Sequence, residues 1–150
     1  MLKKITIALM LVVLGINPEI QAKVTFQEVR TASDKIIVLF FTSDTINVNE
    51  INIDDASQWK INGADVKGIH KYAVQASLCN HHIYLKTEKL KPGEKYSIET
   101  PYGNTDFIFN PEEMFCESIK VNQVGYSAGS KVRYANFAVW TGTGGSSKLE

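Results

Sequence analysis

The feature that most limits what this chain can fold into is a short apolar run from Lys35 to Ser43, which reads KIIVLFFTS. The run consists mainly of β-branched and aromatic residues, and the polar stretches TASD and SDT bound it on either side. A bounded run of this length predicts a β-strand buried on both faces, because buried helices are usually longer. We therefore expect it to be a central strand of a β-protein.

Other segments in the first part of the chain also favour short strands. VTFQEV, which starts at Val24, alternates apolar and polar residues with the period of two expected for a half-buried strand. An Asn62-Gly63 turn follows a strand around Trp59 to Ile61. Further strands are read from KGIHKYAVQAS and HHIYLKTE around Cys79-Asn80, and a hairpin from KYSIETP and TDFIFNP around Tyr102-Gly103-Asn104.

Helical signals are scarce. No segment holds a 3.6-residue period with caps, and INVNEINIDDASQ has room for one short helical turn. Several short strands separated by turns are typical of an all-β sandwich. The fold class predicted for residues 23–110 is thus an all-β, immunoglobulin-like or fibronectin type III-like sandwich.

The segment LKPGEKYSIE, from Leu90 to Glu99, adds a local signal for this fold. A Pro92-Gly93 turn precedes Tyr96, which opens a strand. In Greek-key sandwiches, a tyrosine at this place forms a tyrosine corner, in which its hydroxyl reaches back to a backbone group upstream. We expect Tyr96 to do so with Leu90 packed beneath it; an ordinary half-buried strand tyrosine is the alternative.

The N-terminus has the pattern of a signal peptide. MLKK is a positive start, ITIALMLVVLGI is an apolar run too short to span a bilayer comfortably, and Ala22 is a small residue at the expected cleavage point. Residues 1–22 are thus predicted to be removed, which places the mature protein in the periplasm or outside the cell. An uncleaved membrane anchor is the alternative. After cleavage no membrane contact is expected, because no second apolar segment is long enough to cross.

Composition excludes one class of partner and leaves one question open. The 16 basic residues balance the 16 acidic ones, and no basic patch with interleaved aromatics exists, so nucleic acid is not expected as a partner. The two cysteines, Cys79 and Cys116, are a candidate disulfide in an oxidising compartment. Such a bridge would stabilise the fold by roughly 4 kcal/mol. Two buried free thiols in unrelated strands are the alternative.

A second unit is expected after residue 118. Residues 111–118 contain a proline and acidic residues without a strand pattern, and are predicted to be a linker. IKVNQVGY then places Ile119 and Val121 on one face of a new strand, while Asn122, Gln123 and Tyr126 bring polar groups. Such a strand suits an interface held by hydrogen bonds, or it is an ordinary edge strand with a glycine bulge.

The stretch IKVNQVGYSAGSKVRYANFAVW resembles the start of the N-terminal immunoglobulin-like domain of family nine glycoside hydrolases. The hexapeptide VNQVGY and a following lysine-led strand carry the resemblance, while the loop SAGS lacks the usual proline and the next strand is more aromatic than usual. The resemblance implies a sandwich that braces a catalytic helical, (α/α) barrel acting on β-glucan chains. Asn122, Gln123 and Tyr126 would then be docking groups for that barrel, and none would be catalytic.

Residues 119–150 are too few for a sandwich of about seven strands and 100 residues. We therefore expect an incomplete second immunoglobulin-like domain. The function expected for the chain is that of a non-catalytic segment of a secreted polysaccharide-degrading enzyme. The alternative is a free-standing secreted protein that binds carbohydrate or a surface.

No catalytic, cofactor or metal site is predicted. Cys79, His81 and His82, with His70 upstream, include metal-ligand types, but adjacent histidines in a strand point to opposite faces. The acidic pairs Asp54-Asp55 and Glu112-Glu113 are read as solvated turns, and no serine lies in a GxSxG context. Aromatic residues that could stack on sugars are Trp59, Tyr72, Tyr84, Tyr102 and Trp140.

Overall fold

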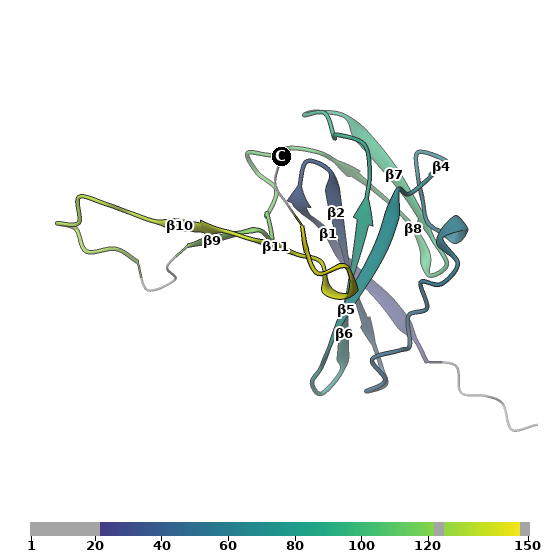
Figure 1. Cartoon of the computed structure of the whole chain (residues 1–150). Coiled ribbons are helices and arrows are strands. Elements are labelled where there is room, and N and C mark those ends of the chain that lie inside the picture. Colours follow the sequence, from purple (N-terminus) through teal and green to yellow (C-terminus); the bar gives the residue numbers. More distant parts are fainter. Residues whose placement is uncertain (1–21, 122–124, 148–150) are drawn as a thin grey trace, which may run out of the picture.

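The computed structural model describes residues 22–121 and 125–147 and shows an all-β protein (Figure 1). Two antiparallel four-stranded sheets form a sandwich, with strand orders β1-β2-β6-β5 and β4-β3-β7-β8. This order matches the ABED and CFG sheets of immunoglobulin-like domains, with one extra strand beside C. The elements of the sandwich are β1 (Val24–Ser33), β2 (Ile36–Ser43), η1 (Ala56–Gln58), β3 (Lys60–Ile61), β4 (Ala64–Asp65), β5 (Gly68–Gln75), β6 (Cys79–Lys86), β7 (Lys95–Thr100) and β8 (Gly103–Ile108).

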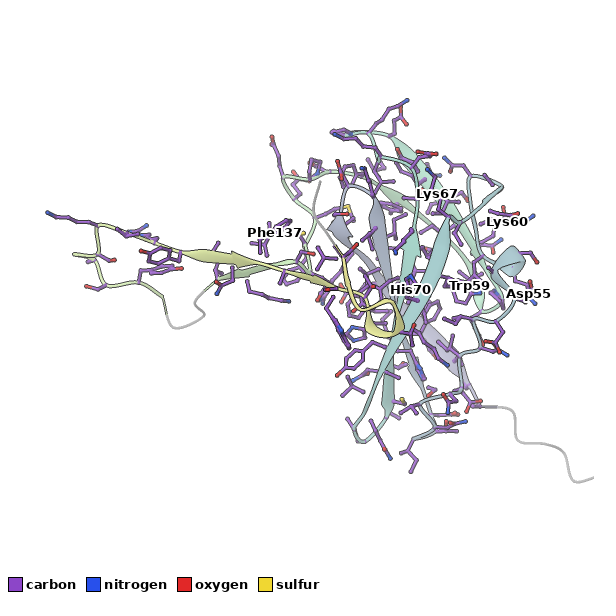
Figure 2. The ribbon with its side chains drawn as sticks, viewed as in Figure 1. Asp55, Trp59, Lys60, Lys67, His70 and Phe137 are labelled. Carbon is purple, nitrogen blue, oxygen red and sulfur yellow. The ribbon has the colours of Figure 1, made fainter. Side chains whose placement is uncertain are left out.

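The remaining elements form two short hairpins. β9 (Ile119–Val121) pairs with β10 (Ala135–Phe137) in an arm that extends away from the sandwich (Figure 1). Phe137 lies on this arm, well apart from Trp59 (Figure 2). β11 (Val139–Trp140), η2 (Gly142–Gly144) and β12 (Ser146–Ser147) then return to the outer face of the first sheet. This part of the predicted second domain therefore packs on the first sandwich.

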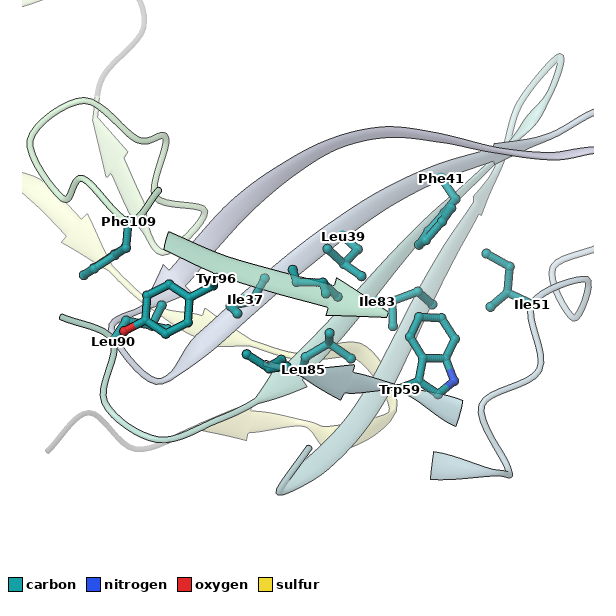
Figure 3. Packing of buried hydrophobic residues seen from close by; sticks show 12 residues of the cluster. Ile37, Leu39, Phe41, Ile51, Trp59, Ile83, Leu85, Leu90, Tyr96 and Phe109 are labelled. Carbon is teal, nitrogen blue, oxygen red and sulfur yellow. The ribbon is translucent and has the colours of Figure 1, made fainter. Parts of the chain in front are cut away.

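The apolar run from Ile36 is a central strand buried on both faces, as its composition predicts. Ile37, Leu39 and Phe41 of β2 point into the space between the sheets, where they meet side chains of β6, β7 and the loop before β3 (Figure 3). Val38, from the opposite face of β2, belongs to a second cluster that includes Tyr84 and Val139. The tail from residue 139 thus covers part of the face that β2 would otherwise expose to water.

Three local predictions are confirmed. Asn62 and Gly63 both have positive φ, 53° and 77°, as a two-residue hairpin turn requires. The Tyr96 hydroxyl accepts a hydrogen bond from the Lys91 backbone amide at 2.9 Å, which makes the tyrosine corner, and Leu90 is in the same core cluster. The one expected helical turn is η1. The turn between β5 and β6 differs slightly, because Cys79 begins β6 instead of lying in the turn.

The segment predicted to be a linker is attached to β1. Thr31 donates its amide to the Phe115 carbonyl at 3.3 Å and accepts a bond from the Glu117 amide at 2.7 Å. The segment runs parallel to β1 at this point. The Arg30 guanidinium also pairs with the Glu117 carboxylate. Residues 115–117 therefore cover part of the outer edge of β1.

The candidate disulfide is not formed, and both cysteines are free thiols. Cys79 lies opposite Ser43 at one end of β2. Cys116 forms an isolated β-bridge with Thr31 of β1. Thr31 in turn pairs with Ile37, which lies near the opposite end of β2. Six residue steps along a strand separate these ends, roughly 20 Å at 3.3 Å per residue, whereas a disulfide needs Cα atoms closer than about 7 Å.

The predicted signal peptide, residues 1–22, lies outside the described residues except for Ala22. Within the described ranges, no helix is long and apolar enough to cross a membrane.

Candidate interaction surface

The predicted docking residues fall on the arm. Asn122 and Gln123 lie outside the described residues. Tyr126 is half-buried, and its hydroxyl donates a hydrogen bond to the Tyr134 carbonyl on the other side of the arm. The polar tip of Tyr126 therefore joins the two sides of the arm to each other, which is a structural role inside the arm.

One face of the arm is apolar and open to water. The register pairs Ile119 with Phe137 and Val121 with Ala135, so these four side chains share one face of the ribbon, with Lys120 and Asn136 on the other. Val121 is 59% exposed and Phe137 52%. The alternation of residues in the sequence predicts that Ile119 and Val121 share one face of β9. It does not predict that β10 pairs with β9 and adds Ala135 and Phe137 to the same apolar face.

The base of the arm is fastened on both sides. The Ser118 hydroxyl donates to the Ala32 carbonyl, and the Ala138 amide donates to the Ser118 carbonyl at 3.0 Å. Val139, which follows at once, is buried. The apolar ribbon is thus held in place by the sandwich at its base while its own faces remain uncovered.

The glycine-rich segment after the arm lies very close to β5. A Cβ on Gly142, whose φ is +62°, would lie 2.1 Å from the Lys71 carbonyl oxygen. The Lys71 amide donates to the Thr143 hydroxyl at 3.1 Å, and Thr141 is fully buried. This segment therefore requires glycine for its approach to β5.

A row of aromatic rings crosses the outer face of the first sheet. Phe40 contacts His82 with ring centroids 4.3 Å apart, and Tyr72 lies 5.7 Å from His82 and 4.7 Å from Trp140. Trp140 is 51% exposed and Tyr72 37%. The sequence singled out Tyr72 and Trp140, but Phe40 and His82 become neighbours only through strand pairing.

Charged groups flank one end of this row. The Arg30 guanidinium lies 4.5 Å from the Phe40 ring centroid and 4.6 Å from that of Phe115. Its charge is balanced by Glu28 and Glu117. Burial lowers the pKa of His82, so the ring is neutral at pH 7. The face therefore offers stacking surfaces beside a set of paired charges.

The other aromatic candidates are occupied by the core. Trp59 and Tyr84 are buried, and the Tyr102 ring packs 5.9 Å from Phe41. Tyr72 and Trp140 are therefore the two members of the predicted set that are exposed side by side.

The candidate metal-ligand side chains are not gathered into one cluster within the described ranges. No group of three or more His, Cys, Asp and Glu side chains is close enough to hold a metal ion within the described ranges. His81 points into the core and bonds the Ser43 hydroxyl at 3.0 Å, whereas His82 lies on the outer face. The predicted opposite orientation of the two histidines is confirmed.

Comparison with known proteins adds no relative: no protein family, curated protein or solved structure matches the chain.

Proposed function

We propose that this chain is a non-catalytic immunoglobulin-like segment of a secreted polysaccharide-degrading glycoside hydrolase. In this proposal the mature chain is periplasmic or secreted, and the arm packs against the rest of the enzyme, which includes a catalytic helical barrel. Asn122 and Gln123, which lie outside the described residues, remain proposed docking groups.

The observation that carries the proposal is the open apolar face of Ile119, Val121, Ala135 and Phe137. A two-stranded ribbon is marginally stable by itself in water. Exposed contiguous apolar surface usually marks a site that another protein surface covers. The resemblance of IKVNQVGY to a barrel-bracing domain supplies the kind of partner.

The decisive experiment is to determine the reading frame beyond codon 150 and assay both products. We expect the frame to encode a helical barrel, and the longer product to release reducing sugar from a β-glucan. The chain alone should match the blank on carboxymethylcellulose, xylan and mixed-linkage glucan. Reproducible hydrolysis by the pure chain, or a frame without a barrel, would contradict the proposal.

A second candidate function is that of a free-standing carbohydrate- or surface-binding protein. The exposed contact between Tyr72 and Trp140 favours it, because sugar rings stack on exposed aromatic side chains. Retention of the chain on insoluble cellulose, lost in a Tyr72→Ala and Trp140→Ala variant, together with a frame that ends without a barrel, would favour this candidate.

A further inference from the structure

Asp44 holds the backbone of Lys23 by two hydrogen bonds. The Lys23 amide donates to one carboxylate oxygen of Asp44 at 2.9 Å, and the Asp44 amide donates to the Lys23 carbonyl at 3.3 Å. Lys23 directly precedes β1, and Asp44 directly follows β2. These strands lie side by side, and Val24 and Ser43 are their first pair (Figure 1). The two bonds therefore close the β1–β2 pair at the residue where the chain enters β1.

The neighbours of this contact are fixed by the sandwich. Val24 packs against the main core cluster. Ser43 is buried, and its hydroxyl donates to the Thr45 carbonyl at 3.2 Å and bonds to the His81 ring at 3.0 Å. The backbone on both sides of Asp44 is thus held, so its carboxylate needs little rearrangement to bind a group at the start of β1.

The carboxylate of Asp44 has no cationic partner among the described residues. The ion pairs that the described ranges contain all involve other acids, and the Lys23 amide is the donor that Asp44 receives. A carboxylate forms a stronger hydrogen bond with a cationic donor than with a neutral amide. The separation of 2.9 Å already suits a bond between an ammonium group and a carboxylate.

Removal of the predicted signal peptide would place a cation at this point. A signal peptidase that hydrolyses the Ala22–Lys23 bond consumes one water molecule. The carbonyl carbon of Ala22 gains the water oxygen and becomes a carboxylate, and the Lys23 nitrogen gains both protons and becomes an ammonium group. This group carries three N–H donors and turns about the N–Cα bond, so one donor can point at Asp44.

We propose that Asp44 captures the new N-terminus of the mature chain, through an ion pair between its carboxylate and the α-ammonium group of Lys23. The pair exists only after cleavage, so processing strengthens the closure of β1 on β2. It also protects the first residue from aminopeptidases, which have to bind a free ammonium group. The inference rests on the secretion proposed above, and it is independent of the glycoside hydrolase context.

The first test is the mass of the protein secreted by a bacterial host that expresses the chain with residues 1–22. We expect a product that begins at Lys23. A product that begins at another residue would overturn the capture, because no ammonium group would then form beside Asp44. A product that keeps residues 1–22 would count against the proposed secretion as well, so the two failures are distinguishable.

The second test compares two chains, one beginning at Ala22 and one at Lys23, during digestion with an aminopeptidase of broad specificity. Mass spectrometry follows the loss of each residue. We expect rapid loss of Ala22, after which both chains resist further digestion at Lys23. Asp44→Asn keeps a hydrogen-bond acceptor but removes the charge, and it should speed the loss of Lys23 by about three-fold, as suits an exposed ion pair.

Two comparisons show whether this effect is ionic and local. The loss of Ala22 in the same digest corrects for changes in the peptidase, and 1 M NaCl should reduce the three-fold difference. The matched control is Asp65→Asn, an exposed aspartate on β4 in the other sheet, which should leave both rates unchanged. Circular dichroism should show both variants folded.

Equal rates of Lys23 loss in the parent and in Asp44→Asn would overturn the capture. A difference that is the same in 1 M NaCl would also overturn it, because the bond would then act without its charge. Neither result bears on secretion or on whether a barrel follows the chain, so the proposed function would stand.

Discussion

The hydroxyl of Tyr96 and the backbone amide of Lys91 are joined by a hydrogen bond of 2.9 Å that ties the start of β7 to the turn before it. Tyr96 is buried among core residues, so its ring and its hydroxyl serve different purposes. The ring fills the core, and the hydroxyl fixes the path of the chain.

Replacement of Tyr96 by Phe should therefore destabilise the sandwich while keeping its core volume. Loss of the bond and desolvation of the Lys91 amide should cost about 1–3 kcal/mol, visible as a lower Tm in thermal unfolding followed by circular dichroism. Tyr134→Phe is the matched control, because Tyr134 is 72% exposed and should change stability by less than about 0.5 kcal/mol. Equal Tm values for both variants would show that the corner contributes nothing.

Val38→Asp should abolish the cooperative melt. Val38 is fully buried in the cluster with Tyr84 and Val139, and an unpaired carboxylate there costs several kcal/mol. The control is Thr25→Asp, since Thr25 is exposed on β1. A cooperative transition in the Val38 variant would mean that the outer face of β2 is open to water.

Gly142→Ala should release the tail that covers this face. The new methyl group would meet the Lys71 carbonyl, and the positive φ adds roughly 1–2 kcal/mol of strain. We expect faster amide hydrogen exchange in residues 139–147 with little change in β7. Gly145→Ala is the control: φ is +66° there, but no atom lies within 4 Å of the position that its new methyl group would take, so it isolates strain from collision. The same exchange rates in both variants would contradict the close approach.

The stability of the fold should fall in mild acid. Burial, and then the charge of Lys71, lower the pKa of His81 below its ordinary value. The unfolded chain binds a proton near pH 6.5, whereas the folded chain resists it. The contribution is therefore fully present above pH 6.5 and is lost as the pH falls toward the folded pKa. The urea midpoint should drop between pH 7.5 and 5, and His81→Gln should flatten this dependence. An equal slope in both proteins would exclude His81 as the cause.

The apolar face of the arm should affect thermal stability only in the proposed enzyme, where a barrel covers it. Ile119→Ser with Phe137→Ser should leave the Tm of the chain alone nearly unchanged, because both side chains are about half exposed. In the proposed enzyme, in which a barrel covers the arm, the same change should lower the Tm by several degrees as buried apolar contacts are lost. The control is Ile46→Ser, since Ile46 is 60% exposed on the sandwich. No difference between these variants in the longer product would argue against docking through the arm.

Local patterns were enough to predict the central strand, the Asn62-Gly63 turn and the Tyr96 corner, because each depends on residues close together in sequence. The attachment of Glu117 to Thr31 was not predictable in this way. It is made by backbone groups and by an ion pair with Arg30, 87 residues away, and neither leaves a periodic signal.

The candidate sites show the same limit. Trp59 was one of several aromatic candidates in the sequence, but its full burial and its unpaired indole N–H depend on how the loop before β3 folds over the indole. The distance between Cys79 and Cys116 likewise depends on which end of β2 each one neighbours.

The attachment of residues 115–117 to β1 sets an order of events during synthesis. β1 is among the first segments to leave the ribosome, and its outer edge is completed only after Glu117 has been made. Until then the nascent sandwich carries an unpaired strand edge, which is the kind of surface that recruits other chains. A pause in translation between β8 and Glu117 would lengthen that period, so the codons for this stretch bear on the yield of folded protein.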